Sequence, residues 1–203
     1  AEYLPMDFSK YVIQHKVIEK PVVDGKEKMN ILLVAIPKDM VDMHYNFIRE
    51  LGLKPKVMDY QSNGVWKFLN YSGSINGTIY PKEKTIAAID LGYCSSNVTI
   101  IKKGNGKFNR VIDSGSQSLD NNIMNLFGIS SDKLLTYKKE ITDVSVIDEG
   151  YSDQNRYTNI VKSSIESLMD KIDKVFKYCA SNETEDRIET LLLYGGMSKI
   201  KGI

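Results

Sequence analysis

Three short extended runs, separated by tight polar turns, occupy residues 85–113 and restrict the fold more than any other part of the chain. The first run ends at Asp90, a small polar loop follows, and the second run covers residues 98–101. After Gly104-Asn105-Gly106 comes a third run, residues 108–112. Apolar runs of this length, bounded by Gly, Asn and Ser, are typical of strands joined by turns. The stretch therefore predicts a three-stranded meander.

The loop after the first of these runs has the composition of a phosphate-binding turn. Asp90 is followed by Gly92, and the loop continues to Ser95 and Ser96. The backbone N–H groups of such a turn can point at an anion, and a carboxylate at the strand end can hold a metal-bound water. The same pattern also fits an ordinary hairpin whose turn carries Ser and Asn. Both interpretations stay open on this stretch alone.

A second strand-like run with glycines at its end covers residues 188–193 and leads into Tyr194-Gly195-Gly196-Met197. Because glycine has no Cβ, this turn would let the backbone approach a flat or phosphorylated ligand. If both strand ends face one cleft, the pair would suit a nucleotide. Neither stretch matches G-x-G-x-x-G or G-x-x-x-x-G-K-[ST], so the Rossmann and Walker patterns are excluded.

Composition excludes other classes of function. The chain has 42% hydrophobic and 26% charged residues, which is typical of a soluble globular protein, and its net charge of +1 gives no basic footprint for nucleic acid. The longest apolar run, residues 31–36, is too short to cross a bilayer. Only Cys94 and Cys179 are present, which favours a reducing cytoplasm over a disulfide scaffold. The two histidines are isolated, so no Ser/His/Asp or Cys/His catalytic set can be assembled.

The N-terminal part of the chain predicts a small β-β-α-β unit. Strand-like runs cover residues 11–18 and 29–36, a helix is expected over 39–51, and a further strand over 53–58. A helix over residues 59–70 follows. It carries Trp66, which we expect to be a core or interface aromatic.

Helical patterns dominate the region after the meander. The polar segment 72–76 before the meander is a candidate domain boundary. Beyond the meander, Ser118 and Ser131 are expected to cap two helices. The longest periodic segment runs from Val161 to Cys179, with apolar residues at alternating gaps of four and three. It predicts a long amphipathic helix that packs on a sheet rather than in a coiled coil.

Two stretches resemble the actin-like ATPase superfamily. The run DLGYCSSNVTIIKKGNGKFNRVIDSG is similar to its second phosphate-binding meander, and LLLYGGMSKIKG is similar to its adenosine-side Gly-Gly turn. The preceding parts narrow the resemblance to the PilM family of type IV pilus assembly proteins, relatives of the cell-division protein FtsA. The specific features are the Tyr-Leu-Pro opening, Ala35-x-Pro37-Lys38 and Gly52-Leu53-x-Pro55-x-x-x-Asp59. The resemblance implies a partial actin-like (ribonuclease H-like) α/β fold.

The resemblance also implies a division of the chain. Residues 1–58 would be the small family-specific subdomain (1C), and residues 59–83 the linking helix and turn segment of the first lobe. Residues 84–116 and 189–203 would form the ATP-proximal sheet subdomain (2A). The residues between them, 117–188, would be the helical inserted subdomain (2B).

The superfamily's functional positions carry over residue by residue, and none is expected to be catalytic. The residues that would contact a nucleotide are Asp90, Gly92, Ser95, Ser96, Lys138, Gly195, Gly196 and Met197. Asp90 would hold Mg²⁺ through water, and the residues of its loop would cradle the phosphates. The Gly-Gly-Met turn would lie against adenosine, with Lys138 near the sugar or base. The implied cofactors are ATP and Mg²⁺ in the intact protein.

The chain departs from the superfamily pattern in several places. The first phosphate loop, another Asp-x-Gly, has no match, and we expect the sequence to begin after that loop and to stop before the final helix. Leu135 stands where relatives often have the Glu that holds the ribose, and Asn97 where many have Thr. Because charge-assisted phosphate contacts come from both loops, we expect no measurable ATP hydrolysis by this 203-residue chain.

The resemblance implies a cytoplasmic scaffold of pilus assembly, held at the inner face of the cell membrane through its partners. It would dock the cytoplasmic N-terminal tail of a PilN-like inner-membrane protein, with pilus motor ATPases as further candidate partners. The alternatives are an FtsA-like cell-division protein and an ATPase or phosphotransferase enzyme of the same superfamily. A kinase needs an acid as base for the acceptor hydroxyl, and no acid besides Asp90 suggests itself.

Overall fold

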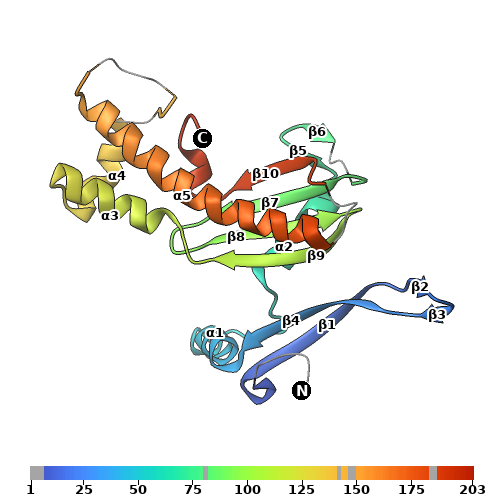
Figure 1. Ribbon diagram of the computed structural model, residues 1–203. Coiled ribbons are helices and arrows are strands. Elements are labelled where there is room, and N and C mark those ends of the chain that lie inside the picture. Colours follow the sequence, from blue (N-terminus) through green and yellow to red (C-terminus); the bar gives the residue numbers. More distant parts are fainter. Residues whose placement is uncertain (1–6, 80–81, 141–142, 146–149, 183–186) are drawn as a thin grey trace. The chain divides into compact units, whose positions relative to one another are not determined.

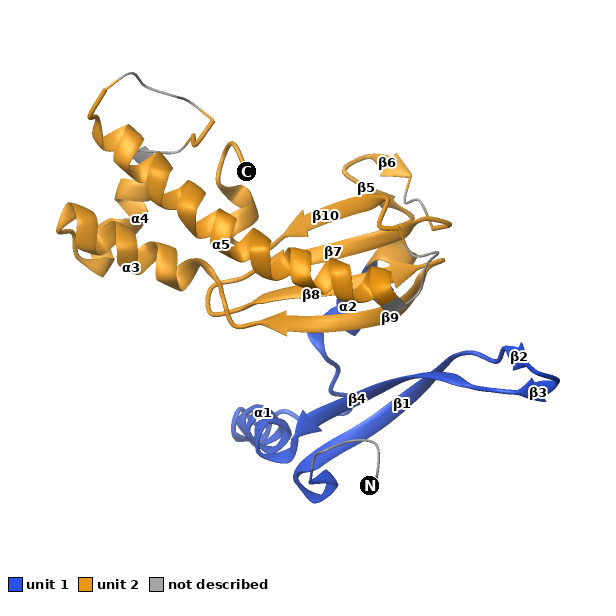
Figure 2. Ribbon diagram, in the orientation of Figure 1, with its two compact units in different colours: residues 1–68 blue, residues 69–203 orange. Residues whose placement is uncertain are grey.

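A computed structural model of the chain describes residues 7–79, 82–140, 143–145, 150–182 and 187–203. The chain divides into two compact units, Ala1–Phe68 and Leu69–Ile203 (Figures 1 and 2). We refer to them as unit 1 and unit 2.

Unit 1 is built on a long hairpin (Figure 1). A short 3₁₀ turn η1 (Phe8–Lys10) leads into β1 (Tyr11–Glu19), which pairs antiparallel with β4 (Asn30–Pro37). The small strands β2 (Val22–Val23) and β3 (Lys26–Glu27) close the hairpin tip. Helix α1 (Lys38–Glu50) follows directly. The two predicted strands and the first predicted helix are confirmed.

The strand expected over residues 53–58 is wrong. Residues 53–60 have no regular secondary structure. Pro55 has no N–H for a strand ladder, and Val57 is 85% exposed, so it packs against nothing. The observed order in unit 1 is therefore strand, strand, helix, followed by an irregular linker to α2 (Gln61–Ser72).

Helix α2 begins beside Asp59, whose carboxylate accepts hydrogen bonds from the Tyr60 N–H at 2.9 Å and the Asn63 amide at 2.8 Å. Trp66 is half-buried in this helix, and the Lys16 ammonium lies 3.6 Å from its ring centroid. This distance is that of a cation–π contact. The aromatic thus joins α2 to β1 within unit 1.

Unit 2 contains the predicted meander in a four-stranded mixed sheet with the order β10-β7-β8-β9. Strands β7 (Thr85–Leu91), β8 (Ser96–Lys102) and β9 (Asn105–Ile112) are antiparallel neighbours. The late strand β10 (Thr190–Tyr194) pairs parallel with β7. Ahead of the sheet, the polar segment forms a two-stranded turn, β5 (Ser74–Ile75) and β6 (Thr78–Ile79).

Three helices complete unit 2: α3 (Ser116–Phe127), α4 (Ser131–Glu140) and α5 (Asp153–Asn182). A 3₁₀ turn η2 (Met197–Lys199) follows β10. The expected capping roles of Ser118 and Ser131 are wrong. Helix α3 already begins two residues before Ser118, and at α4 it is the carbonyl of Ser130 that accepts the N–H groups of Lys133 and Leu134, both at 3.1 Å.

Helix α5 packs on the sheet, as its periodicity predicted (Figure 1). Its buried residues Val161, Leu168, Ile172 and Val175 share one hydrophobic core with residues of β7 and β8 such as Ile89. Burial of this apolar stripe, at about 25 cal/mol per Å², is the main force that holds helix and sheet together. Among the helices that the structure describes, none has the length and apolar character needed to span a bilayer.

Candidate functional site

The two glycine-bearing strand ends predicted from the sequence are neighbours in the sheet. Strands β7 and β10 run parallel, with Tyr194 opposite Asp90. Parallel neighbours end at the same side of a sheet, and ligands of α/β proteins bind there. We call this region, residues 90–95 and 194–197, the carboxyl edge of unit 2.

Gly195 is required at the carboxyl edge for two independent reasons. Its φ is +92°, which side chains other than glycine rarely adopt. A Cβ at this position would overlap the Asp90 Oδ1 and would lie 2.7 Å from the Leu91 carbonyl oxygen. The backbone at the end of β10 therefore presses directly on the Asp90 side chain.

The neighbouring Gly196 is under no such constraint. Its φ is −64°, and no atom of the surrounding chain lies within 4 Å of the point that a Cβ would occupy. The residue is also accessible from the surface. A flat ligand could approach the bare backbone at Gly196, whereas Gly195 serves the fold.

Helix α3 braces the Asp90 loop. The N–H groups of Ser116 and Gln117 donate to the carbonyls of Gly92 and Tyr93, both at 3.0 Å. Gly115 lies so close that a Cβ would overlap the Tyr93 carbonyl and stand 2.7 Å from that of Gly92. Two of the unpaired N–H groups at the start of α3 are thus satisfied by the loop, which holds the loop in one shape.

The predicted phosphate-cradle residues have different environments. Ser96 is completely buried, and its Oγ donates to the Ser114 carbonyl at 2.7 Å, so in this conformation it clamps the loop to the segment after β9. Ser95 is half-buried beside Gly92. Asn97 is also buried, and its Oδ1 accepts from the Asn109 amide. Of the two predicted serine hydroxyls, Ser95 is the one that lies near the surface.

Met197 and Lys138 are turned to other partners. The Met197 side chain is 4% exposed and belongs to the hydrophobic core, so it offers a ligand its backbone alone. The Lys138 ammonium lies 2.7 Å from Asp120 Oδ1, with the two side chains 24% and 11% exposed. This ion pair ties α4 to α3. Within the described part of the chain, no hydrogen bond or ion pair carries Lys138 to the carboxyl edge.

Sequence reasoning missed Tyr194, which lies beside Asp90. Its hydroxyl is buried without a hydrogen-bond partner among the described residues. Burial and the charge of Asp90 raise the pKa of the Tyr194 phenol to about 12, so it is a neutral donor at physiological pH. An unpaired buried hydroxyl costs about 1–3 kcal/mol. In the sequence, the signal for Tyr194 was its position directly before Gly195-Gly196. The signal for the contact between α3 and the Asp90 loop was the position of Gly115 between a strand and a helix.

The described residues contain no group of three or more His, Cys, Asp and Glu side chains suited to a metal ion. The prediction for Asp90 needs a single carboxylate, because Mg²⁺ keeps several waters and takes further oxygens from phosphates. A carboxylate at a strand end, next to a backbone without Cβ, fits that donor set.

The mixed sheet, the helix across it and the paired carboxyl edge define an actin-like fold. The PilM-PilN type IV pilus biogenesis complex has a chain similar to this one with a TM-score of 0.74 and 16% identity, over 99% of this chain and 54% of that one. MreB 5 of Spiroplasma citri bound to AMPPNP is similar with a TM-score of 0.58 and 14% identity, over 82% of this chain and 55% of that one. The chain therefore spans about half the length of these structures.

The family model described as type IV pilus assembly protein PilM matches residues 1–203. The chain belongs to this family, which confirms the resemblance found in the sequence. The predicted actin-like α/β fold is confirmed as well. A comparison with curated protein sequences gives no match.

Proposed function

We propose that the chain is part of a cytoplasmic scaffold of type IV pilus assembly, which binds ATP at the carboxyl edge and docks the tail of a PilN-like inner-membrane protein through unit 1. The observation that carries the nucleotide part is the contact between the Gly195 backbone and Asp90. It brings together the two elements that the superfamily uses for phosphate and adenosine. The similar MreB 5 structure was bound to AMPPNP.

In this proposal each element of the carboxyl edge has a role that follows from its chemistry. Asp90 orients a water of the Mg²⁺ ion, which supplies positive charge to the phosphates. The braced loop presents backbone N–H groups and the Ser95 hydroxyl. The exposed backbone of Gly196 admits a flat base, and the Tyr194 phenol supplies a neutral donor.

The tail-docking part of the proposal rests on an apolar surface of unit 1. Val17 and Ile31 are directly opposed in the β1–β4 ladder, and Leu33 lies two residues along on the same face. Their side chains are 39%, 50% and 40% exposed. Exposed apolar residues grouped on a sheet are typical of interaction sites, and a two-stranded ladder can accept a further strand at its edge. The similar PilM-PilN structure is a complex with PilN.

Nucleotide binding is tested on the intact, longer protein by titrating a fluorescent ATP analogue with and without Mg²⁺. Asp90→Ala should weaken binding at least tenfold, about 1.4 kcal/mol, and should abolish the effect of Mg²⁺. Glu166→Ala removes an exposed carboxylate of α5 and is the matched control. Equal affinities for the Asp90 and Glu166 variants would show that the carboxyl edge is not the site.

Tail docking is tested by calorimetry with the synthetic cytoplasmic tail of the cognate PilN-like protein. Replacing Ile31 and Leu33 together by Ser removes two half-exposed side chains, each contributing about 1 kcal/mol when covered. We expect affinity to fall about tenfold or more. Val57→Ser, at an 85% exposed site outside the ladder, is the control. An unchanged affinity in the double variant would exclude this face.

A further inference from the structure

Unit 2 carries a groove that neither proposed site uses. It lies between β9, the edge strand of the sheet, and the second half of α5, and has a volume of about 630 Å³. Every second residue of an edge strand turns its N–H and C=O groups away from its neighbour. Among the described strands none pairs with the outer edge of β9, and such an edge is a template for pairing with another extended chain.

One end of the groove is aromatic. The rings of Phe108 and Tyr178 lie with their centroids 5.5 Å apart at an angle of 38°. Val175, which is 8% exposed, lies one helical turn before Tyr178 and lines the same groove. These three side chains form an apolar floor that one side chain of an added strand could cover.

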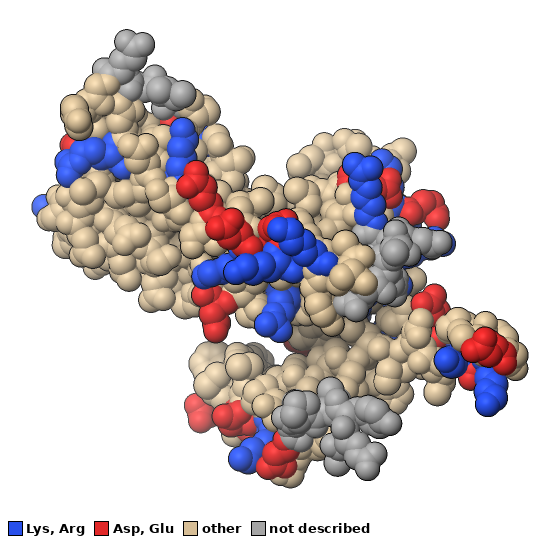
Figure 3. Space-filling model, viewed as in Figure 1, with Lys and Arg blue, Asp and Glu red and all other residues tan. Residues whose placement is uncertain are grey.

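Apart from Val111 and Ile112, the rest of the groove is lined by charged side chains, most of them cationic. Arg110 on β9 and Lys171 and Lys174 on α5 line it, against the single acid Asp113. Among the described residues no ion pair engages any of these three cations. Figure 3 shows Lys and Arg side chains gathered where α5 passes over the sheet.

Two acids of the same helix lie near these cations without forming an ion pair with them. Asp170 precedes Lys174 by four residues, but no ion pair joins the two among the described residues. Asp173 lies 2.6 Å from the Lys177 ammonium in an i,i+4 pair. Asp170, a further turn back on that face, also raises the pKa of Lys177. Lys171 and Lys174 are one turn apart, about 4.5 Å along the axis, and face the groove.

We propose that this groove docks an extended acidic segment of a partner protein, which adds to the free edge of β9. Phe108 of β9 lies against Tyr178 of α5 at the aromatic end of the groove. From that end the cations follow, Arg110 forward along β9 and Lys174 and then Lys171 backward along α5. The segment would place one apolar anchor on Phe108 and Tyr178 and acidic side chains at alternate positions beside Arg110, Lys174 and Lys171. Main-chain pairing supplies affinity, and the alternation supplies selectivity.

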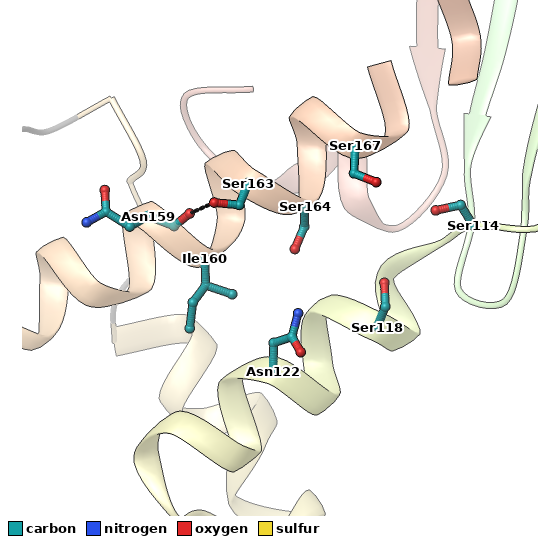
Figure 4. Close-up of a pocket in the computed structure, with 8 residues that line it drawn as sticks. All are labelled: Ser114, Ser118, Asn122, Asn159, Ile160, Ser163, Ser164 and Ser167. Atoms are coloured by element: carbon teal, nitrogen blue, oxygen red, sulfur yellow. Dashed lines mark hydrogen bonds between the residues drawn. The ribbon is translucent and has the colours of Figure 1, made fainter. Parts of the chain in front are cut away.

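A second hollow, lined mainly by Ser and Asn, lies between α3 and α5 (Figure 4). It has a volume of about 460 Å³ and is lined by small polar side chains such as Ser118, Asn122 and Ser164. Its lining residues include no charged side chain and a single apolar one, Ile160, and this lining indicates no particular ligand.

The probe for the β9 groove is a fluorescein-labelled peptide Phe-Thr-Glu-Thr-Glu-Thr-Glu, in which Phe and the Glu side chains share one face of an extended strand. It is measured together with its reversed sequence, by anisotropy with the 203-residue chain. We expect one of the two to bind at about 50 mM salt and to weaken several-fold at about 300 mM, since exposed charges are screened. The version with Lys in place of Glu should not bind. A version N-methylated at alternate residues should also lose binding, because it cannot pair with the β9 edge.

Charge reversal locates the site. Lys171→Glu with Lys174→Glu should weaken peptide binding at least tenfold. Lys133→Glu with Lys162→Glu makes the same change of net charge on α4 and α5, outside the lining residues, and should alter it less than twofold. Circular dichroism of both variants checks that they fold.

Three results would overturn the proposal. They are no acidic-peptide binding up to about 1 mM, an equal loss in the two charge-reversal variants, and full binding by the N-methylated peptide. Binding of anionic phosphatidylglycerol vesicles without binding of the peptide would assign the cations to a lipid surface instead.

Discussion

The adjacent glycines of the carboxyl edge allow one sharp test of the structure. Gly195→Ala places a methyl group on a residue with φ +92° and against Asp90 and the Leu91 backbone. The backbone conformation costs about 1–2 kcal/mol for a residue with a Cβ, and moving the surrounding atoms costs about 1–3 kcal/mol more. We therefore expect the free energy of unfolding to fall by about 2–5 kcal/mol. Gly196→Ala, at a φ of −64° with open space around it, should be neutral or stabilise by about 0.4–1 kcal/mol.

The assay is urea and thermal unfolding followed by far-ultraviolet circular dichroism. Trp66 belongs to unit 1 and so reports on the wrong part of the chain for this purpose. For a chain of this length the midpoint temperature moves by about 2–4 °C per kcal/mol, so Gly195→Ala should lower it by about 5 °C or more. If Gly195→Ala were as stable as the parent, or Gly196→Ala lost as much, the packing of β10 against Asp90 would be refuted.

Further expectations concern the buried polar groups around the same edge, each measured by urea denaturation. Ser96→Ala should cost about 1–3 kcal/mol, because it leaves the Ser114 carbonyl without its buried donor; an unchanged stability would mean that water reaches that carbonyl. Lys138→Met should cost about 2–4 kcal/mol by leaving Asp120 unpaired at 11% exposure, and adding Asp120→Asn should recover most of it; a failure to recover would show that packing, not charge, is lost. The raised pKa of Tyr194, about 12 against the ordinary 10.0, means that below pH 10 both folded and unfolded states hold the phenol proton. Between pH 10 and 12 the unfolded state ionises first, so this residue should lower stability by up to about 2–3 kcal/mol as pH rises, and Tyr194→Phe should remove that loss when wild type and variant are compared across the range.

Local sequence patterns predicted most of the elements. The strands of the meander, β1, β4, β10 and the long helix α5 were all predicted from apolar periodicity and turn residues, because burial on one face and chain reversal leave a direct trace in a short window. The strand expected over 53–58 failed because its apolar residues have no neighbouring strand or helix to cover them. The caps expected at Ser118 and Ser131 failed because both serines lie inside their helices. At α3 the carbonyls of Gly92 and Tyr93 accept the first N–H groups, and at α4 the helix begins one residue earlier than expected, after Ser130.

The candidate site was predicted in part. Asp90 and Gly195 were identified from their positions at strand ends, and the structure places them in contact. The inward directions of Ser96, Lys138 and Met197 could not be predicted, because each depends on a partner distant in the sequence or on the packed core. A side chain's type does not say which of several distant partners it will meet.

The sequence by itself determined the kinds of element, their order and the family, since these depend on local periodicity, turn chemistry and matching motifs. Tertiary structure alone decided that β10 pairs parallel with β7, which turns two remote glycine-bearing strand ends into one edge. It also decided that β9 is an edge strand of the described sheet and lies beside a cationic stretch of α5. Strand order depends on which faces of distant elements bury each other, and that choice is made by the core as a whole rather than by any single segment.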